Sequence, residues 1–250
     1  MIVTGIKREH AKDVALLHID GISTGFISSL GADFVTCLYE AIAQSDVSFG
    51  FIARDDSGLL GFATLTTNLS RLYRSVVLKK GPRFAALLAR KMLSVRRLKK
   101  VFETLSYPSR TEVVDLPVAE LLSVVVAERQ RRKGLATKLI RRSFLECDRR
   151  GIEKVKVLVG ADNEPANRLY ATLGFEPAGQ IDSHGVASNI YVGRTSLVLS
   201  KRIAEEVVVS APAEAHKFDI AEIPSAATKA GETLRAESQQ KQRPTNPAHP

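Results

Sequence analysis

The chain has 250 residues, 44% of them hydrophobic and 25% charged, a composition typical of a water-soluble globular protein and unlike a collagen, a disordered chain or a membrane bundle. No apolar run approaches the roughly 20 residues of a membrane-spanning helix, and the N-terminal residues lack the pattern of a secretory signal, so we expect a cytoplasmic protein. The formal charge of +9 is concentrated, because residues 71–100 contain eleven Lys or Arg and no Asp or Glu, whereas the rest of the chain holds 25 basic and 27 acidic residues.

The first part of the chain predicts a strand, two amphipathic helices and a β-hairpin. Apolar residues at helical spacing indicate the helices, and two apolar runs flank the sequence Asp55-Asp56-Ser57-Gly58, which is a strong hairpin signal. The expected elements are a strand at 2–8, helices at about 10–22 and 32–44, and strands at 47–54 and 59–68.

An insert at residues 69–118 follows and holds most of the excess positive charge. Pro82 marks a helix start, and apolar residues recur at helical spacing between Arg and Lys, which predicts a basic amphipathic helix. A solvated helix face, an anionic membrane surface and a phosphate-bearing substrate at 79–100 all remain open as explanations. Sequence-specific nucleic-acid binding is disfavoured, since no helix-turn-helix or zinc-finger pattern accompanies the charge.

The remaining chain predicts further strands and helices and then a tail. Gly151 and Gly174 mark helix ends. From residue 203 the composition changes to Ala, Glu, Pro, Ser and Gln, which cannot bury enough apolar area to offset ordering entropy. We therefore expect a folded domain at 1–202 and a mostly disordered tail at 203–250. The expected elements are strands at 119–126, 155–159, 176–181 and 189–199, and helices at 131–150 and 164–173.

The cysteines and histidines predict neither disulfides nor a metal site. Cys37 and Cys147 lie far apart in helix-like apolar patterns, as expected of two buried thiols. The five histidines show no ligand spacing, so we expect no metal.

A basic, glycine-containing turn joins a buried strand to a helix and has the properties of an anion site. A helix N-terminus exposes about four unpaired N–H groups and the positive end of its dipole, and a glycine lets the backbone approach a phosphate closely. Neighbouring Arg and Lys side chains add positive charge. The strand end, turn and helix start contain Val124, Val125, Val126, Arg131, Arg132, Lys133, Gly134, Leu135, Ala136 and Thr137.

Within this stretch, Arg131-x-x-Gly134-x-Ala136 resembles the (Gln/Arg)-x-x-Gly-x-(Gly/Ala) pyrophosphate loop of the GNAT superfamily of acetyl-CoA-dependent N-acetyltransferases. The chain has no Gly-x-Gly-x-x-Gly fingerprint and no P-loop, which disfavours other phosphate-binding folds. The resemblance implies that these ten residues bind acetyl-CoA as a cosubstrate. It also implies that one backbone N–H of the Val124–Val126 strand donates to the thioester carbonyl and stabilises the oxyanion.

A second motif, from Asn163 to Phe175, is similar to the superfamily segment Asn-x-x-Ala-x-x-x-Tyr-x-x-x-Gly-Phe. In the family the asparagine lies where two parallel strands separate around the cofactor, and the tyrosine protonates the departing thiolate. The resemblance implies these roles for Asn163 and Tyr170, and a phenol is protonated at neutral pH as the role requires. The alternative for Tyr170 is an ordinary amphipathic-helix position with its hydroxyl at the rim.

Glu120 is the candidate general base. By the two-residue period of a strand, we expect it to share a face with Leu122, Val124 and Val126. Some superfamily members carry their catalytic glutamate at this offset, whereas others place it five residues before the motif asparagine, where this chain has Leu158. A solvent-facing Glu120, and a water chain that replaces a dedicated base, are the alternatives.

The resemblance implies a mixed α/β fold: a mostly antiparallel sheet that separates at the cofactor site, helices on both faces, and the helical insert between the third and fourth strands. It implies an N-acetyltransferase that moves an acetyl group directly from acetyl-CoA to a primary amine. For the acceptor we expect a small molecule such as an amino sugar, recognised by residues 22–30 and nearby loops. A protein or peptide amine is the alternative acceptor, and a CoA-binding module that acts through the basic insert is the alternative function. The sequence predicts no oligomeric state.

Overall fold

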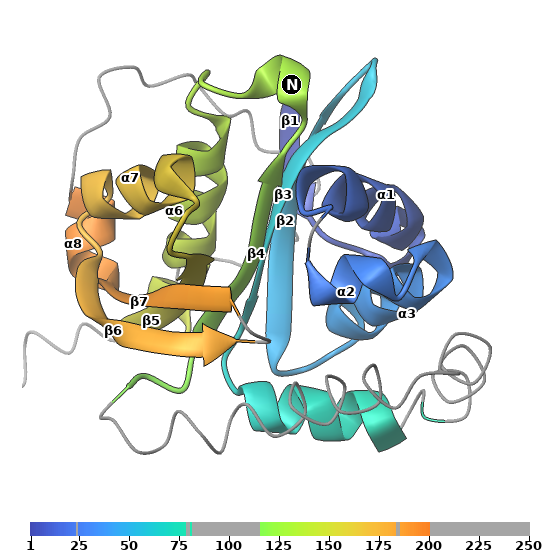
Figure 1. Cartoon of the computed structure of the whole chain (residues 1–250). Helices are drawn as coiled ribbons and strands as arrows, with labels where there is room; N and C mark the ends of the chain where they lie inside the picture. Colours follow the sequence, from blue (N-terminus) through green and yellow to red (C-terminus); the bar gives the residue numbers. More distant parts are fainter. Residues whose placement is uncertain (24, 79–80, 82–115, 184–185, 201–250) are drawn as a thin grey trace, which may run out of the picture. The chain divides into compact units, whose positions relative to one another are not determined.

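The computed structural model describes residues 1–23, 25–78, 81, 116–183 and 186–200 (Figure 1). By its internal contacts the chain divides into residues 1–209 and 210–250, and every described residue belongs to the first unit. The basic helix expected within 79–100 and the tail expected at 203–250 lie outside the described residues and stay predictions. No helix in the described part is long and apolar enough to cross a membrane.

Seven strands form one sheet in the described part of the chain. They are β1 (Ile2–Gly5), β2 (Ser48–Asp55), β3 (Gly58–Thr66), β4 (Glu120–Val126), β5 (Lys154–Gly160), β6 (Glu176–Ser183) and β7 (Val186–Arg194). Their order across the sheet is β1-β2-β3-β4-β5-β7-β6, and every neighbouring pair is antiparallel except β4 and β5. The expectation of a mixed, mostly antiparallel sheet is confirmed.

Helices cover both faces of this sheet (Figure 1). They are η1 (Arg8–His10), α1 (Ala11–Gly21), α2 (Phe26–Ser29), α3 (Ala32–Ala43), η2 (Glu128–Gln130), α6 (Leu135–Arg149), α7 (Glu164–Thr172) and α8 (Thr195–Ser200), and residues 69–78 are also helical. On one face α1, α3 and residues 69–78 pack in one core cluster, and on the other face α6, α7 and α8 pack in a second.

Large side chains on each face hold these layers together. Tyr39 of α3 and Phe62 of β3 are almost completely buried on the α1 side, and their rings meet edge to face at 5.3 Å. On the α6 side, the rings of Phe144 and Phe175 meet at 5.4 Å. Each such buried side chain contributes about 1.5–3 kcal/mol through removal of apolar area from water. Cys37 and Cys147 are buried, as expected.

Two predicted elements are wrong in their extent or type. The helix expected from Arg131 begins at Leu135, because Arg132 and Gly134 have φ values of 62° and 75° in the left-handed region and cannot continue a right-handed helix. The end of the strand expected at 189–199 is instead the short helix α8. Its Val198 is buried in the α6-side core, and Arg141 of α6 donates to the last carbonyls of α8.

The helix at residues 69–78 is not among the elements that the sequence predicts. Leu69 and Leu72 are buried in the α1-side core cluster, and Tyr73 packs against the same cluster. Asn68 caps this helix, since its Oδ1 accepts a hydrogen bond from Arg71 N–H at 2.9 Å. The first part of the expected insert, residues 69–78, is therefore a helix that packs against the sheet.

Candidate active site

The parallel strands β4 and β5 pair only where β4 begins, against the middle of β5. Glu120 lies opposite Lys156 and Leu121 opposite Val157, with one more hydrogen bond from Lys156 N–H to the Ala119 carbonyl. From Leu122 onward the two strands have no paired residues. The sheet therefore opens between β4 and β5, as the family resemblance led us to expect.

The backbone of β4 offers hydrogen-bonding groups to this opening. Ala127 N–H donates to the Leu60 carbonyl of β3, and Val125 lies opposite Phe62 in the same ladder. Because alternate residues of an antiparallel strand bond to the same neighbour, Val125 directs its N–H and carbonyl toward β3. Val124 and Val126 direct theirs to the side of the opening.

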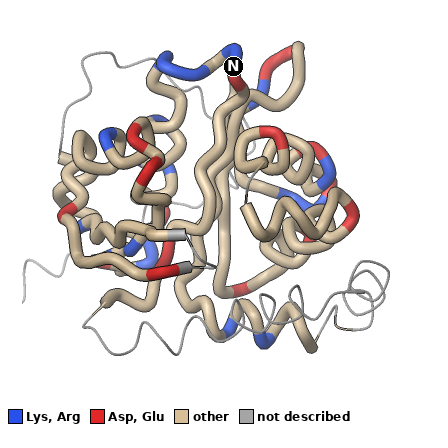
Figure 2. The backbone as a smooth tube through the Cα atoms, viewed as in Figure 1, with Lys and Arg blue, Asp and Glu red and all other residues tan. Residues whose placement is uncertain are grey.

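The basic turn that follows β4 lies at the start of α6. Figure 2 shows Lys and Arg gathered along this connection, where Arg131, Arg132 and Lys133 are exposed. Arg131 folds back, with Nε donating to the Val126 carbonyl at 3.3 Å. Side chains of the turn thus lie at the end of β4 that faces the opening.

The N-terminus of α6 has N–H groups that the helix itself does not use. Its first hydrogen bond runs from Lys138 N–H to the Gly134 carbonyl, so the N–H groups of Leu135, Ala136 and Thr137 have no backbone acceptor among the described residues. A Cβ added to Gly134 would meet no atom within 4 Å. This open, positively charged end can bind a phosphate group by its backbone.

The second motif forms the N-terminal turn of α7. Asn163 is the N-cap of α7, with Oδ1 accepting from Ala166 N–H at 3.3 Å, and it is exposed. Sequence reasoning missed Asn167, which ties three elements together. Its Nδ2 donates to the Gly160 and Asn163 carbonyls, and its Oδ1 accepts from Asn189 Nδ2 and the Tyr191 hydroxyl.

Tyr170 lies on α7 in the α6-side core. It is 6% exposed, and its ring packs 5.2 Å from Phe175 and 6.2 Å from Tyr191. Burial raises the pKa of Tyr170 above its usual value near 10, so the hydroxyl is protonated at neutral pH. Within the described residues this hydroxyl has no hydrogen-bond partner, so its proton is available to an acceptor.

Glu120 is not solvent-facing, which removes one of the alternatives raised by the sequence. It is 7% exposed, its Oε2 lies 3.8 Å from Lys156 Nζ, and Oε2 has no hydrogen-bond partner among the described residues. Burial raises the pKa of Glu120 from 4.5 to about 7, although Lys156 acts in the opposite direction. A carboxyl with such a pKa can exchange protons at neutral pH.

We expected Glu120 to share a strand face with Val124 and Val126, and this expectation is wrong. Thr64 lies opposite Ser123 but Leu65 lies opposite Leu121, so β4 has one extra residue, a β-bulge at Leu122. Leu122 and Val125 consequently pack with α1 and α3, whereas Val124 and Val126 pack on the α6 side.

The C-terminal end of α1 lies directly on β4. A Cβ added to Gly21 would overlap Val125 Cγ1, so only glycine permits this approach. Beneath it, His18 Nδ1 and the Tyr39 hydroxyl form a buried hydrogen bond of 2.7 Å. The segment after α1, which we expected to recognise an acceptor, therefore begins beside the C-terminal end of β4.

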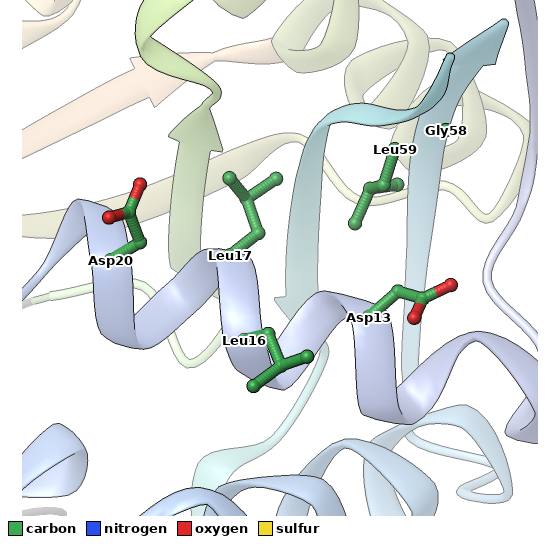
Figure 3. Close-up of a pocket in the computed structure, with 6 residues that line it drawn as sticks. All are labelled: Asp13, Leu16, Leu17, Asp20, Gly58 and Leu59. Carbon is green, nitrogen blue, oxygen red and sulfur yellow. The ribbon is translucent and has the colours of Figure 1, made fainter.

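A shallow pocket lies elsewhere, between α1 and the β2–β3 hairpin. Figure 3 shows Asp13 and Asp20 at the two ends of the α1 side with Leu17 between them, and Leu59 on the hairpin across from Asp13. None of the predicted site residues lines this pocket, so it is separate from the candidate active site.

Comparison with known proteins identifies the family. A sequence model of the acetyltransferase (GNAT) family matches residues 21–175, which is more than half of the chain and includes β4, the basic turn and α7. The chain belongs to the GNAT acetyltransferase family. It is therefore an acyltransferase, and its family uses acetyl-CoA. No curated protein matches the chain.

Solved structures of acetyltransferases are similar to this chain at low sequence identity. An N-acetyltransferase from Staphylococcus aureus Mu50 has a TM-score of 0.50 and 15% identity over 78% of this chain and 98% of its own. A GNAT-family acetyltransferase from Desulfovibrio desulfuricans has a TM-score of 0.49 and 14% sequence identity, over 77% of this chain and 99% of its own. Arabidopsis thaliana NAA60 in complex with acetyl-CoA has a TM-score of 0.49 and 16% sequence identity, over 77% of this chain and 97% of its own.

In this GNAT protein, the predicted site residues come from three parts of the fold. Glu120, Val124 and Val126 come from β4, the basic turn precedes α6, and Tyr170 comes from α7. Two of the predicted site residues have structural roles. The backbone of Val125 bonds to β3 and its side chain packs with α1 and α3, away from the opening, and the Leu135 side chain is buried in the core on the α6 side. Sequence reasoning missed Lys156, because a lysine between valines of a strand is typical of an exposed position.

Proposed function

We propose that this GNAT protein transfers an acetyl group from acetyl-CoA to a primary amine by direct, sequential transfer. The observation that supports the proposal is the opening between β4 and β5, together with the basic helix N-terminus that follows β4 and the buried side chains of Tyr170 and Glu120. The residues present fit acetyl-CoA, since they supply a phosphate site beside a strand with outward-facing backbone groups.

Each part of the site has a separate role in the proposed reaction. The N–H groups of Leu135, Ala136 and Thr137, with Arg132 and Lys133 beside them, bind the pyrophosphate of acetyl-CoA. The outward-facing groups of Val124 and Val126 hold the pantetheine chain, and a β4 N–H stabilises the oxyanion, a contact worth about 3–4 kcal/mol in other enzymes.

The proton transfers use the two titratable residues. Glu120 accepts a proton from the acceptor ammonium, and the amine nitrogen attacks the thioester carbon to form the new N–C bond. The C–S bond breaks as Tyr170 gives its proton to the sulfur, and the amide nitrogen loses its remaining extra proton, which restores the Tyr170 hydroxyl. Correct positioning supplies much of the acceleration, so no nucleophilic side chain is needed.

For the acceptor we propose a small-molecule primary amine. Its amine would approach the face of β4 where Glu120 lies, the face that α1 and residues 69–78 cover. The buried position of Glu120 suits a compact amine rather than an extended surface. A protein or peptide amine remains the alternative.

Acetyl-CoA binding is the first test, and α6 offers a matched pair of variants. Gly134 and Gly151 stand at opposite ends of this helix, both with left-handed φ and both with open space at Cβ. A Glu at either position meets the same backbone strain, about 1–2 kcal/mol. Only Gly134→Glu places a carboxylate at the proposed pyrophosphate site.

By isothermal titration calorimetry, we expect Gly134→Glu to abolish acetyl-CoA binding while Gly151→Glu retains the wild-type affinity. Equal loss in both folded variants, or no binding by the wild type, would overturn the proposed site. Once binding is established, a panel of small primary amines and amine-terminated peptides, assayed by CoA release, identifies the acceptor class. Acetylation of peptides alone would contradict the small-molecule proposal.

A further inference from the structure

Lys156 occupies a particular place in the sheet, at the last paired rungs of β4 and β5 before the strands separate. It lies opposite Glu120 in the parallel register, and its side chain is only 7% exposed. Lysine is among the residues least often buried without a partner, because desolvating an ammonium is costly. Its position therefore needs an explanation beyond strand formation.

Glu120 supplies the partner. The Lys156 ammonium lies 3.8 Å from Glu120 Oε2, and both side chains are more than nine-tenths buried. This distance exceeds that of a good hydrogen bond, and Oε2 has no hydrogen-bond partner among the described residues. The positive charge of Lys156 thus stabilises the negative charge on this carboxylate oxygen, while the oxygen stays free to accept a proton.

We propose that Lys156 is a positioning residue that keeps the Glu120 carboxylate ionised and oriented toward the opening of the sheet. The inference rests on the proposed function, in which Glu120 is the general base. Lys156 itself touches neither substrate in this proposal. It acts through Glu120.

The charged and titratable surroundings of Glu120 support this assignment. Lys156 from β5 favours the ionised carboxyl, and burial opposes it. From residues 69–78, Tyr73 faces Glu120: burial raises the pKa of Tyr73, and the nearby Glu120 charge raises it further. From β3, Thr66 lies opposite Glu120, but its hydroxyl donates to the Val47 carbonyl. In the described part of the chain, Lys156 is thus the cation that offsets the desolvation of Glu120.

Lys156→Met tests the proposal, because methionine keeps an unbranched side chain without the charge. Lys154→Met is the matched control, since Lys154 is exposed on the same strand. In full-length protein with 13C-labelled Glu side chains, the Glu120→Gln variant identifies the Glu120 carboxyl signal. We expect the NMR titration midpoint of that signal to rise by about one pH unit or more in Lys156→Met and to stay unchanged in Lys154→Met.

Kinetics give the second measurement. The acid limb of the kcat/KM profile should move to higher pH in Lys156→Met by the same amount as the NMR midpoint, with acetyl-CoA affinity unchanged. An unmoved NMR midpoint in folded Lys156→Met overturns the proposal. If the wild type acetylates no amine, the proposed function fails, but the NMR titration still decides the role of Lys156. Should Lys156→Met not fold, Lys156→Gln provides the same comparison.

Discussion

At the scale of single residues, Tyr170 differs from its neighbour Tyr191 in what its hydroxyl does. The Tyr191 hydroxyl donates to Asn167 Oδ1, whereas that of Tyr170 has no partner in the described part of the chain. For Tyr170→Phe we expect kcat to fall about 100-fold or more, because the departing thiolate loses its proton donor. Steady-state kinetics would check this, with Tyr191→Phe as the control that keeps a kcat near the wild-type value. Equal kcat in wild type and Tyr170→Phe would exclude Tyr170 as the acid.

The pH dependence of activity is a second residue-scale prediction. Since the pKa of Glu120 is about 7, the carboxyl is largely protonated below that pH and cannot accept the ammonium proton. We expect kcat/KM to rise with pH through a midpoint near 7, and this limb to disappear in Glu120→Gln. A midpoint near 4.5, the ordinary value for a glutamate, would show that the working base is not a buried Glu120.

The sequence predicts residues that act through local motifs better than residues that act across strands. Tyr170 and Gly134 stand in short patterns with fixed spacing, so each could be named in advance. Lys156 stands in no such pattern. It meets Glu120 because of the register of β4 against β5, and this register cannot be read from the sequence because the whole of α6 lies between the two strands. Asn167 is similar, since its partners Asn189 and Tyr191 lie on β7.

At the scale of elements, Asn167 connects the start of α7 to β5 and β7. Asn167→Ala would leave the Gly160 and Asn163 carbonyls without their side-chain donor and would free two groups on β7. We expect the free energy of unfolding to fall by about 2 kcal/mol in urea denaturation. Asn189→Ala, which removes one of these contacts, should cost less; an equal or larger cost would contradict the central role of Asn167.

Most elements follow from periodicity, and the exceptions have local physical causes. The hairpin around Asp55–Gly58 and the helices α1 and α3 are confirmed because turn signals and apolar spacing agree there. The short helix α8 was mistaken for a strand end, since an apolar run of Leu197, Val198 and Leu199 fits either structure. The bulge at Leu122 has no sequence signal, because it is defined by pairing with β3.

At the scale of the whole molecule, two buried titratable groups, His18 and Glu120, change the free energy of unfolding in opposite directions as the pH falls. Burial lowers the pKa of His18 from 6.5 to about 4, so the folded state binds fewer protons than the unfolded state between these values. His18 therefore destabilises the fold as pH falls through this window. Glu120, with its raised pKa, has the opposite effect as pH falls from about 7 to 4.5.

A comparison with His18→Gln isolates the histidine, because Glu120 is the same in both proteins. We expect the wild type to lose about 2 to 3 kcal/mol relative to His18→Gln between pH 7.5 and 4.5. Urea denaturation at the two pH values would measure the difference. A pH-independent difference would mean that His18 is protonated as easily in the fold as in the unfolded chain.

The narrow junction between β4 and β5 also bears on how the chain folds. Strands β1 to β4 precede α6, and β5 to β7 follow it, so each half of the sheet is a continuous stretch of sequence. The described strands of the two halves pair at two positions, and the α6-side core cluster also contains side chains from both halves, with Leu65 and Leu121 packed in the same cluster as Val155 and Val157. We infer that this shared core makes the two halves unfold together, so the place where substrates would meet lies between two halves that are joined mainly by buried side chains.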